Sequence, residues 1–281
     1  MTTSNNFKRI WLITGASRGI GAKIAAAALA NGDAVVATAR DANSITQRFG
    51  DQPGLLAVTL DVTDEAQGVA VAKAAIEHFG RIDVLVNNAG FGLLGAVEEA
   101  TADEVRRVYE TNVFGLLNVT RAVLPYMRAA RSGHVINLSS VGGYRSGAGF
   151  GVYCSTKFAV EGLSEALHAE LEPLGVKVTI VEPGYFRTEF LEGNSLVESP
   201  FSIADYDGTA GEVRKIAKVV TLNQPGDPDK LARVMITLVE AQKAPLRLPL
   251  GSDCVAAIEA KNSFVADELQ TWREVSVSTD F

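Results

Sequence analysis

The sequence contains few of the residues that hold secreted or metal-bound domains together. Its 281 residues include two cysteines, Cys154 and Cys254, and three histidines. Two cysteines cannot form a disulfide framework, so nothing in the sequence indicates an oxidising compartment. No paired-cysteine or H-E-x-x-H spacing is present. The sequence therefore predicts no metal site.

Long hydrophobic runs and an excess of basic residues are also missing. No stretch approaches the roughly 18 uncharged apolar residues of a membrane span. Residues 1–10, MTTSNNFKRI, lack the apolar core of a signal peptide. The chain has 26 basic and 33 acidic residues, a net charge of −7, whereas nucleic-acid-binding proteins carry basic surfaces. We therefore expect a cytoplasmic protein with neither a nucleic-acid nor a membrane partner.

Short apolar runs alternate with helix-length segments along most of the chain. Runs without polar alternation are typical of a parallel sheet covered on both faces, and strands separated by helices predict right-handed βαβ units. The expected fold is α/β, a doubly wound, mostly parallel, Rossmann-like sheet in a single domain, residues 1–281. The predicted strands are residues 10–13, 34–37, 55–60, 84–86, 135–138, 176–181 and 246–250, and the predicted helices are residues 19–30, 64–79, 101–128 and 153–174.

Two segments interrupt this alternation. Residues 185–228 form a long, irregular stretch with several aromatic residues, which is typical of a functional lid. Residues 252–281 place Val255, Ile258, Val265, Leu269 and Trp272 at helical spacing. This periodicity predicts a C-terminal helix that docks on the body of the protein or on a partner chain.

A glycine-rich turn joins the first predicted strand to the first predicted helix. It reads Thr14-Gly15-Ala16-Ser17-Arg18-Gly19-Ile20-Gly21. Glycine permits a sharp turn and a close approach of the backbone, and a helix N-terminus offers unpaired N–H groups to a phosphate. Such turns also arise for steric reasons alone, but the strand before and the helix after favour binding of a dinucleotide pyrophosphate.

Three polar residues in the second half of the chain suggest proton chemistry. Tyr153 and Lys157 are four residues apart in a predicted helix, so both project from one face. A nearby ammonium lowers the pKa of a phenol, typically by about 1–3 units, which favours proton exchange with a carbonyl or alcohol oxygen. Ser140 follows a predicted strand and can donate a hydrogen bond to that oxygen. The alternatives, a core tyrosine and an exposed lysine, do not explain the combination.

Together these motifs resemble the short-chain dehydrogenase/reductase family of the compact single-domain type. T-G-x-x-x-G-x-G, the N-N-A-G sequence at 87–90, Y-x-x-x-K at 153–157 and the Pro183-Gly184 pair occur in the family's order between residues 8 and 250. The resemblance implies the catalytic residues Asn112, Ser140, Tyr153 and Lys157. The cofactor contacts that it implies are Gly15, Ser17, Arg18, Gly19, Ile20, Asp61, Val62, Asn88, Ala89, Gly90, Tyr153, Lys157, Pro183, Gly184 and Thr188.

The same resemblance carries three further expectations. The family's serine lies thirteen residues before its tyrosine, which selects Ser140 and leaves Ser139 a structural or cofactor-side role. The helix is expected to kink at Asn112, so that an exposed main-chain carbonyl holds a water linking Lys157 to solvent. A homo-oligomer, dimer or tetramer, is expected to pack through residues 101–128 and 153–174.

The end of the second predicted strand indicates which cofactor is bound. Enzymes that use NAD place a carboxylate there for the ribose 2′-hydroxyl, but this chain has Ala39 followed by Arg40. Arg18 and Arg40 suit a 2′-phosphate, because guanidinium groups bind phosphate through charge-assisted hydrogen bonds. The prediction is NADP(H); the alternative is that both arginines are solvated surface residues.

The substrate loops, residues 91–93, 144–150 and the lid, are rich in aromatic and small residues. They predict an apolar small-molecule carbonyl or alcohol, with steroids, retinoids, aryl ketones and aldehydes all open. The favoured activity is NADP(H)-dependent hydride transfer on CH–OH groups. A dehydratase or epimerase and a non-catalytic dinucleotide sensor are the alternatives, and a sensor would be expected to have lost Tyr153 or Lys157.

Overall fold

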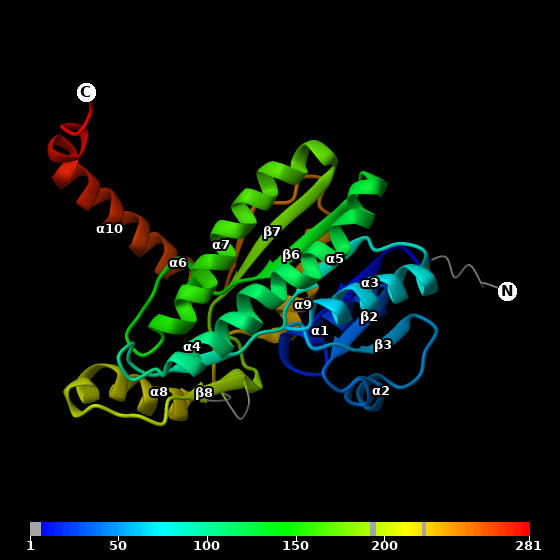
Figure 1. Ribbon diagram of the computed structural model, residues 1–281, viewed down its shortest axis with the longest axis horizontal. Helices are drawn as coiled ribbons and strands as arrows, with labels where there is room; N and C mark the ends of the chain where they lie inside the picture. Colours follow the sequence, from blue (N-terminus) through cyan, green and yellow to red (C-terminus); the bar gives the residue numbers. More distant parts are fainter. Residues whose placement is uncertain (1–6, 192–194, 221–222) are drawn as a thin grey trace.

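The computed structural model describes residues 7–191, 195–220 and 223–281. Residues 1–6, part of the segment used above to judge the amino terminus, lie outside this description. A seven-stranded sheet with the order β3-β2-β1-β4-β6-β7-β9 forms the centre, and its strand pairs are parallel (Figure 1). The predicted doubly wound α/β fold is therefore confirmed. The strands are β1 (Ile10–Ile13), β2 (Ala34–Ala39), β3 (Leu55–Thr59), β4 (Val84–Asn87), β6 (Gly133–Leu138), β7 (Val176–Pro183) and β9 (Arg247–Leu250).

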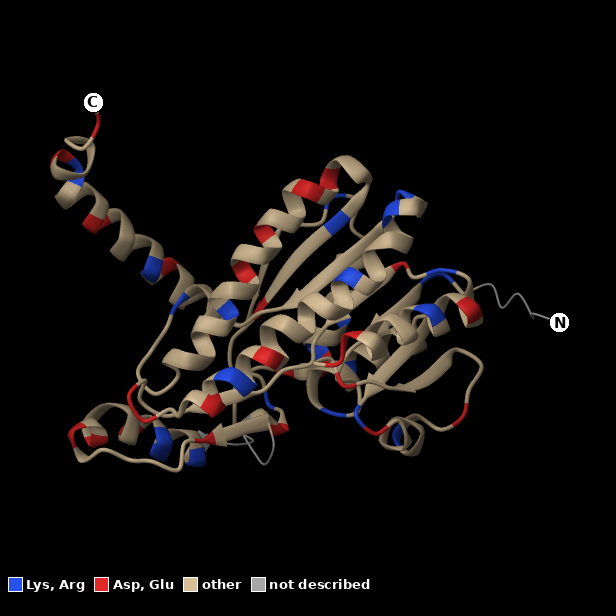
Figure 2. Cartoon of the chain, viewed as in Figure 1, with Lys and Arg blue, Asp and Glu red and all other residues tan. Residues whose placement is uncertain are grey.

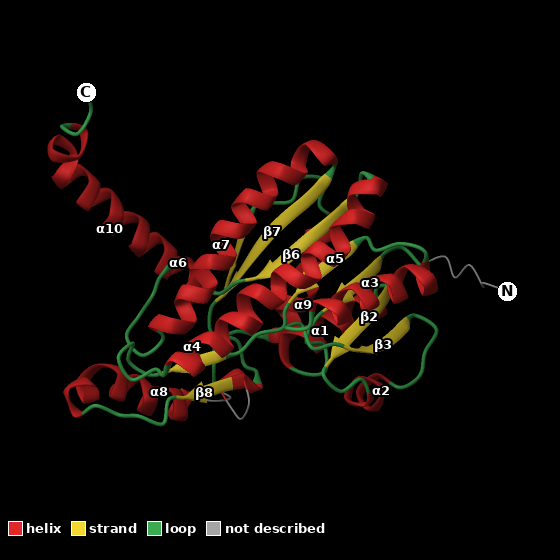
Figure 3. Ribbon diagram, in the orientation of Figure 1, coloured by secondary structure: helices red, strands yellow, loops and turns green. Residues whose placement is uncertain are grey.

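Helices cover both faces of this sheet (Figure 3). Helices α1 and α9 pack on one face, and α3, α5 and α7 pack on the other. Strands β1, β2 and β4 are buried along their whole length, as double coverage requires. The helices are α1 (Gly19–Ala30), α2 (Asn43–Phe49), α3 (Glu65–Phe79), α4 (Ala102–Tyr109), α5 (Gly115–Ala130), α6 (Val141–Tyr144), α7 (Gly151–Leu171), α8 (Glu212–Val220), α9 (Pro228–Glu240) and α10 (Ser252–Val277).

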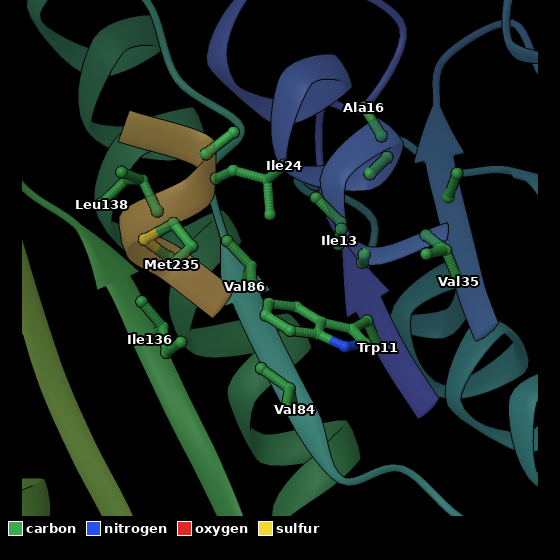
Figure 4. Close-up of a cluster of buried hydrophobic side chains, with 14 of the residues drawn as sticks. Trp11, Ile13, Ala16, Ile24, Val35, Val84, Val86, Ile136, Leu138 and Met235 are labelled. Carbon is green, nitrogen blue, oxygen red and sulfur yellow. The ribbon is translucent and has the colours of Figure 1, made fainter. Parts of the chain in front are cut away.

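One hydrophobic cluster fixes the first helical layer to the sheet. Figure 4 shows Trp11 of β1 and Ile136 of β6 beneath Ile24 of α1 and Met235 of α9. The indole N–H of Trp11 donates to the buried carboxylate of Asp33, 3.0 Å away, so its polar atom is satisfied. Strands β2 and β3 follow β1 on one side of the sheet, and β4 and the later strands lie on its other side. The direction in which the chain adds strands therefore reverses at β1. Ligands of such sheets bind at this switch point, outside the carboxyl ends of the strands.

The structure differs from the prediction in the segment expected to be one helix at residues 101–128. Helix α4 begins with a capping box between Thr101 and Glu104, and a π-helical segment, Glu110–Phe114, separates it from α5. A π segment adds one residue to a turn but leaves the chain helical on both sides, so sequence alone predicts one continuous helix.

The segment predicted as an irregular lid also contains regular structure. Helix α8 lies within it, and β8 (Leu196–Glu198) pairs in parallel with β5 (Gly92–Leu94) to form a second, two-stranded sheet. Residues 192–194 and 221–222 of this segment lie outside the described part of the chain. The buried carboxylate of Glu99 binds Arg214 of α8 at 2.5 Å, so a charged contact attaches α8 to the body.

Helix α10 extends away from the body (Figure 1). Its first turns pack on α6 and β9, where Cys254 is fully buried and Asn262 accepts a hydrogen bond from Tyr144 at 2.5 Å. Further along, Leu269 and Trp272 are 56% and 62% exposed. Only the first turns of the predicted C-terminal helix therefore dock on the body. No helix among the described residues is both long and apolar enough to cross a lipid bilayer.

Candidate active site

A cavity of about 1110 Å³ lies at the carboxyl edge of the sheet. Its wall contains Ser140, Tyr153 and Lys157 of the predicted catalytic set, whereas Asn112 lies behind the wall. Every residue predicted to contact the cofactor also lines it. These residues are Gly15, Ser17, Arg18, Gly19, Ile20, Arg40, Asp61, Val62, Asn88, Ala89, Gly90, Tyr153, Lys157, Pro183, Gly184 and Thr188.

The glycines of the first turn serve different structural needs. Gly15 and Gly19 have φ angles of +66° and +56°, a left-handed conformation that favours glycine. Gly21 has no such angle, but a Cβ there would lie 2.4 Å from Nδ2 of Asn88 and 2.5 Å from the carbonyl oxygen of Gly15. The turn and the start of α1 thus pack closely against the loop after β4.

Hydrogen bonds join the ends of β1 and β4 into one floor for the cavity. The hydroxyl of Thr14 accepts from the backbone N–H groups of Asn88 and Ala89, both at 3.0 Å. In return, the Asn88 amide donates to the carbonyl oxygens of Thr14 at 2.9 Å and Gly15 at 3.1 Å. Helix α1 begins without a capping side chain, so its first N–H groups are available at the cavity wall.

Arginines gather where the cavity passes the end of β2. Arg40 is exposed directly after Ala39, and Arg18 precedes the first residue of α1. Arg48 of α2, which the sequence analysis did not select, donates through Nε to the carbonyl oxygen of Ser17 at 2.9 Å. The carboxylate of Asp61 accepts from the N–H and hydroxyl of Thr63, which holds the loop after β3.

The three polar residues of the proton chemistry meet where β6 ends and α7 begins. Ser140 lies two residues after the end of β6 and hydrogen-bonds the phenol of Tyr153. Tyr153 and Lys157 lie on one face of α7, with the lysine Nζ 5.9 Å from the centre of the tyrosine ring. Lys157 Nζ donates to the carbonyl oxygen of Leu138 at 2.8 Å. The arrangement can exchange a proton with an oxygen atom placed between Ser140 and Tyr153.

The spacing of Tyr153 and Lys157 predicts a net fall in the pKa of Tyr153, but in this structure that pKa lies above its ordinary value. Burial raises the pKa of Tyr153 above its ordinary value, and the hydrogen bond from Ser140 opposes this rise without cancelling it. Burial also lowers the pKa of Lys157 to about 8, and the nearby carboxylate of Glu161 opposes that fall. Desolvation penalises both charged forms, so it outweighs the attraction assumed from sequence spacing.

Asn112 lies in the π-helical segment, where its side chain is buried. Its oxygen accepts from the N–H of Phe91 at 3.0 Å, and its amide donates to the Phe91 carbonyl at 2.9 Å and to Thr156 at 3.1 Å. A Cβ on Gly90 would lie 3.0 Å from the Asn112 oxygen. The side chain therefore ties α7 to the loop after β4.

Aromatic rings border the other side of Tyr153. The ring centres of Phe150 and Phe190 lie 6.2 and 5.8 Å from that of Tyr153. Tyr185 of the lid also lines the cavity, and its backbone N–H donates to the Asp253 carboxylate at 2.7 Å. The start of α10 thus holds the loop after Pro183. These rings belong to the substrate loops that the sequence predicts from their aromatic and small residues.

The fold and the arrangement of this site are those of the dehydrogenase class of α/β proteins, and the comparisons with known proteins are specific. Residues 9–197 match the family model of the short chain dehydrogenases. The chain belongs to this family of oxidoreductases. It is 37% identical to Oxidoreductase BOA17 of Botryotinia fuckeliana, over 96% of this chain and 99% of that protein. It is 36% identical to 3-ketodihydrosphingosine reductase of Bacteroides thetaiotaomicron, over 94% and 96%.

Solved structures agree with this assignment. A short-chain dehydrogenase from Streptomyces avermitilis is 42% identical with a TM-score of 0.89, over 97% of this chain and 100% of that one. ElxO with NADP bound is 27% identical with a TM-score of 0.74, over 89% and 100%. The 3-ketoacyl-(acyl-carrier-protein) reductase from Brucella melitensis complexed with NADH is 26% identical with a TM-score of 0.74, over 87% and 97%. Structural neighbours thus bind either nicotinamide dinucleotide.

Proposed function

We propose that the protein is an NADP(H)-dependent oxidoreductase acting on an apolar carbonyl or secondary alcohol. The observation that carries this proposal is the joint position of Ser140, Tyr153 and Lys157 in the wall of one cavity that also contains the glycine turn. The uncapped start of α1 fits a pyrophosphate, because helix N-terminal N–H groups bind anions. A dinucleotide held by these residues would supply or accept the hydride.

The side chains around the substrate oxygen then have separate tasks. Tyr153 donates a proton to the oxygen in reduction and accepts it in oxidation. Ser140, which hydrogen-bonds the Tyr153 phenol, orients that oxygen and stabilises its developing negative charge. The Lys157 ammonium favours the tyrosinate and is available to ribose hydroxyls, while Asn112 keeps α7 and the loop at Phe91 in register.

The preference for NADP(H) is supported at the end of β2. Position 39, at the end of β2, is an alanine rather than a carboxylate residue, and Arg18 and Arg40 both line the cavity. The next carboxylate, Asp41, accepts a hydrogen bond from the N–H of Asn43 at 3.0 Å in its own turn. A 2′-phosphate would therefore meet two cations at this end of the site.

The preference for an apolar substrate is supported by Phe150, Tyr185 and Phe190 beside Tyr153. The name of one relative, 3-ketodihydrosphingosine reductase, denotes reduction of a ketone and agrees with this choice. Residues 185–228 would act as the lid within a single domain, in a cytoplasmic protein. A dimer or tetramer would pack through α4, α5 and α7, which light scattering at micromolar concentrations can test.

The activity is tested by following NADPH and NADH absorbance with a panel of ketones, aldehydes and alcohols. Tyr153→Phe should lower turnover at least about a hundredfold, within the 10²–10⁴-fold range of acid–base catalysis, while cofactor binding is retained. A variant that keeps more than about a tenth of the wild-type kcat would contradict the role of Tyr153. Product formed without net cofactor oxidation or reduction would instead indicate a dehydratase or epimerase.

The cofactor preference is tested by Arg40→Ala. A hydrogen bond to a charged group contributes roughly 1.5–3 kcal/mol, so kcat/KM for NADPH should fall about ten- to a hundredfold. The value for NADH should change little, because NADH lacks the 2′-phosphate, and it serves as the internal control. Equal losses with both cofactors, or a wild-type protein that prefers NADH, would refute the proposed preference.

A further inference from the structure

A group of buried carboxylates lies directly behind Lys157. Helix α7 carries Lys157, Glu161 and Glu165 at intervals of one turn, so all three project from one face. Lys157 and Glu161 are buried, whereas the Glu165 side chain is 55% exposed. Glu161 is thus an ionisable residue inside the protein, one turn from the lysine that serves the proposed chemistry.

The sheet places further charges against Glu161, in a part of the molecule that otherwise has few. Strands β1, β2, β3, β4 and β6 contain no lysine, arginine, aspartate or glutamate, as the uncoloured centre of Figure 2 shows. Strand β7 contributes Glu182, and β9 contributes Arg247. Arg247 binds Glu161 directly, binds Glu182 at 2.7 Å and binds Glu165 at 2.5 Å.

Arg247 alone does not give every buried carboxylate oxygen of this cluster a hydrogen bond. The Glu182 side chain is 1% exposed, and its Oε2 has no hydrogen-bond partner among the described residues. Burial raises the pKa of Glu161, with the Glu182 charge adding to the rise, while Ser139 and Arg247 oppose it. Two carboxylates that share one cation in a buried site do not readily ionise together. Glu161 therefore gives up its proton only above the pH at which an ordinary glutamate ionises.

In the described part of the chain, the remaining neighbours of Glu161 and Glu182 do not supply a second positive charge. Cys254 of α10 donates to the carbonyl oxygen of Glu182, and burial raises the pKa of its thiol to about 12, so it stays neutral. Tyr144 of α6 stacks on the Arg247 guanidinium, 5.6 Å from ring centre to carbon. Ser139, directly after β6, is buried and carries no charge. The charge of Glu161 acts instead on Lys157, which lies one turn earlier on the same face of α7, and it opposes the fall that burial causes in the pKa of Lys157.

We infer that Glu161, held by Arg247 and Glu182, is a positioning residue that keeps Lys157 in its ammonium form during turnover. It does not touch the reacting atoms. Its negative charge compensates Lys157, whose protein contact is the neutral carbonyl oxygen of Leu138. This inference rests on the proposed function, in which the ammonium of Lys157 favours the tyrosinate of Tyr153.

Glu161→Gln tests the inference, and Glu165→Gln is the matched control on the same helix face and the same arginine. In alcohol oxidation, activity is lost at high pH when Lys157 releases its proton. Without the Glu161 charge this alkaline limb of kcat/KM should move to lower pH by about one unit, the lower end of the effect of a nearby opposite charge. Glu165→Gln should keep the wild-type profile, and Glu161→Asp should restore most of it.

A second readout does not depend on catalysis. The ammonium of Lys157 can be titrated by NMR in protein labelled with [ε-¹³C]lysine, with its signal assigned by Lys157→Arg. The pKa of Lys157 should be lower in Glu161→Gln than in wild type and unchanged in Glu165→Gln. Superimposable titrations and pH profiles in a folded Glu161→Gln protein would overturn the inference. Absence of any redox turnover in the wild type would instead refute the proposed function, and the NMR comparison would still decide the effect of Glu161 on Lys157.

Discussion

Two buried clusters in this protein join an arginine to glutamates, and they behave in opposite ways. Under the lid, Glu99 binds Arg214 at 2.5 Å and also accepts from the N–H groups of Ala96 at 2.7 Å and Ile203 at 2.8 Å. These bonds, led by the one from Arg214, lower the pKa of Glu99 to about 2. Every donor around this carboxylate stabilises its charged form, so the Glu99–Arg214 pair attaches α8 firmly to the body.

Behind Lys157 the same residue types have too few donors. Arg247 is divided among Glu161, Glu165 and Glu182, and burial raises the pKa of Glu161. The comparison shows that the presence of an arginine does not decide the state of a buried carboxylate. What decides it is the number of hydrogen-bond donors and positive charges per carboxylate. A saturated cluster contributes stability, and an unsaturated one remains sensitive to pH.

The largest effect is expected from breaking the saturated cluster. Arg214→Met leaves Glu99 buried without its cation, and loss of one partner of a buried ion pair typically costs about 3–5 kcal/mol. Denaturant unfolding at neutral pH should therefore show a large drop in the free energy of unfolding. A loss below about 1 kcal/mol, the value of exposed ion pairs, would mean that the Glu99–Arg214 pair does not hold α8 to the body.

The pH dependence of stability should separate the two clusters by sign. The pKa of Glu99 is lowered from 4.5, so its stabilisation is present above pH 4.5 and is lost as the pH falls towards 2. The pKa of Glu161 is raised, so the protein loses stability as the pH rises above 4.5. Each unit by which the pKa of a group differs between the folded and unfolded states changes the free energy of unfolding by up to roughly 1.4 kcal/mol.

Accordingly, Glu99→Gln should lower the free energy of unfolding relative to wild type at pH 8 and have little effect near pH 2. Glu161→Gln should have little effect near pH 4 and should match or exceed wild-type stability at pH 8. Unfolding curves for the three proteins at several pH values test this. Equal destabilisation by both substitutions at pH 8 would show that the clusters do not differ.

The part of the site that sequence could predict depends on residues close together in the chain. The turn from Gly15 to Gly21 needs glycine for its own backbone, and Tyr153 and Lys157 meet because they are one helical turn apart. Strand and helix positions follow from local apolar runs in the same way. These features require only neighbouring residues, so the sequence alone indicates the sheet, the cavity edge and the central proton chemistry.

The features that could not be predicted depend on distant pairs or on desolvation. Arg214 and Arg247 meet their buried glutamates across 115 and 86 residues, and no short motif marks such partners. The rise in the pKa of Tyr153 comes from burial, which spacing does not report. The outer face of α10 shows the same limit, because periodicity identifies the apolar stripe but not whether the body covers it.

The smallest effect is expected at the exposed outer partners of the two arginines. Glu198 binds Arg214 at 3.4 Å and is 42% exposed, and Glu165 binds Arg247 with 55% exposure. Surface pairs of this kind contribute about 0–1 kcal/mol, because water screens the charges and the side chains lose conformational freedom. Glu198→Gln and Glu165→Gln should therefore change the free energy of unfolding by less than 1 kcal/mol. A larger loss in Glu165→Gln alone would show that the Arg247 cluster needs its third carboxylate. The two clusters would then differ in how many carboxylates each arginine binds, rather than in the number of donors per carboxylate.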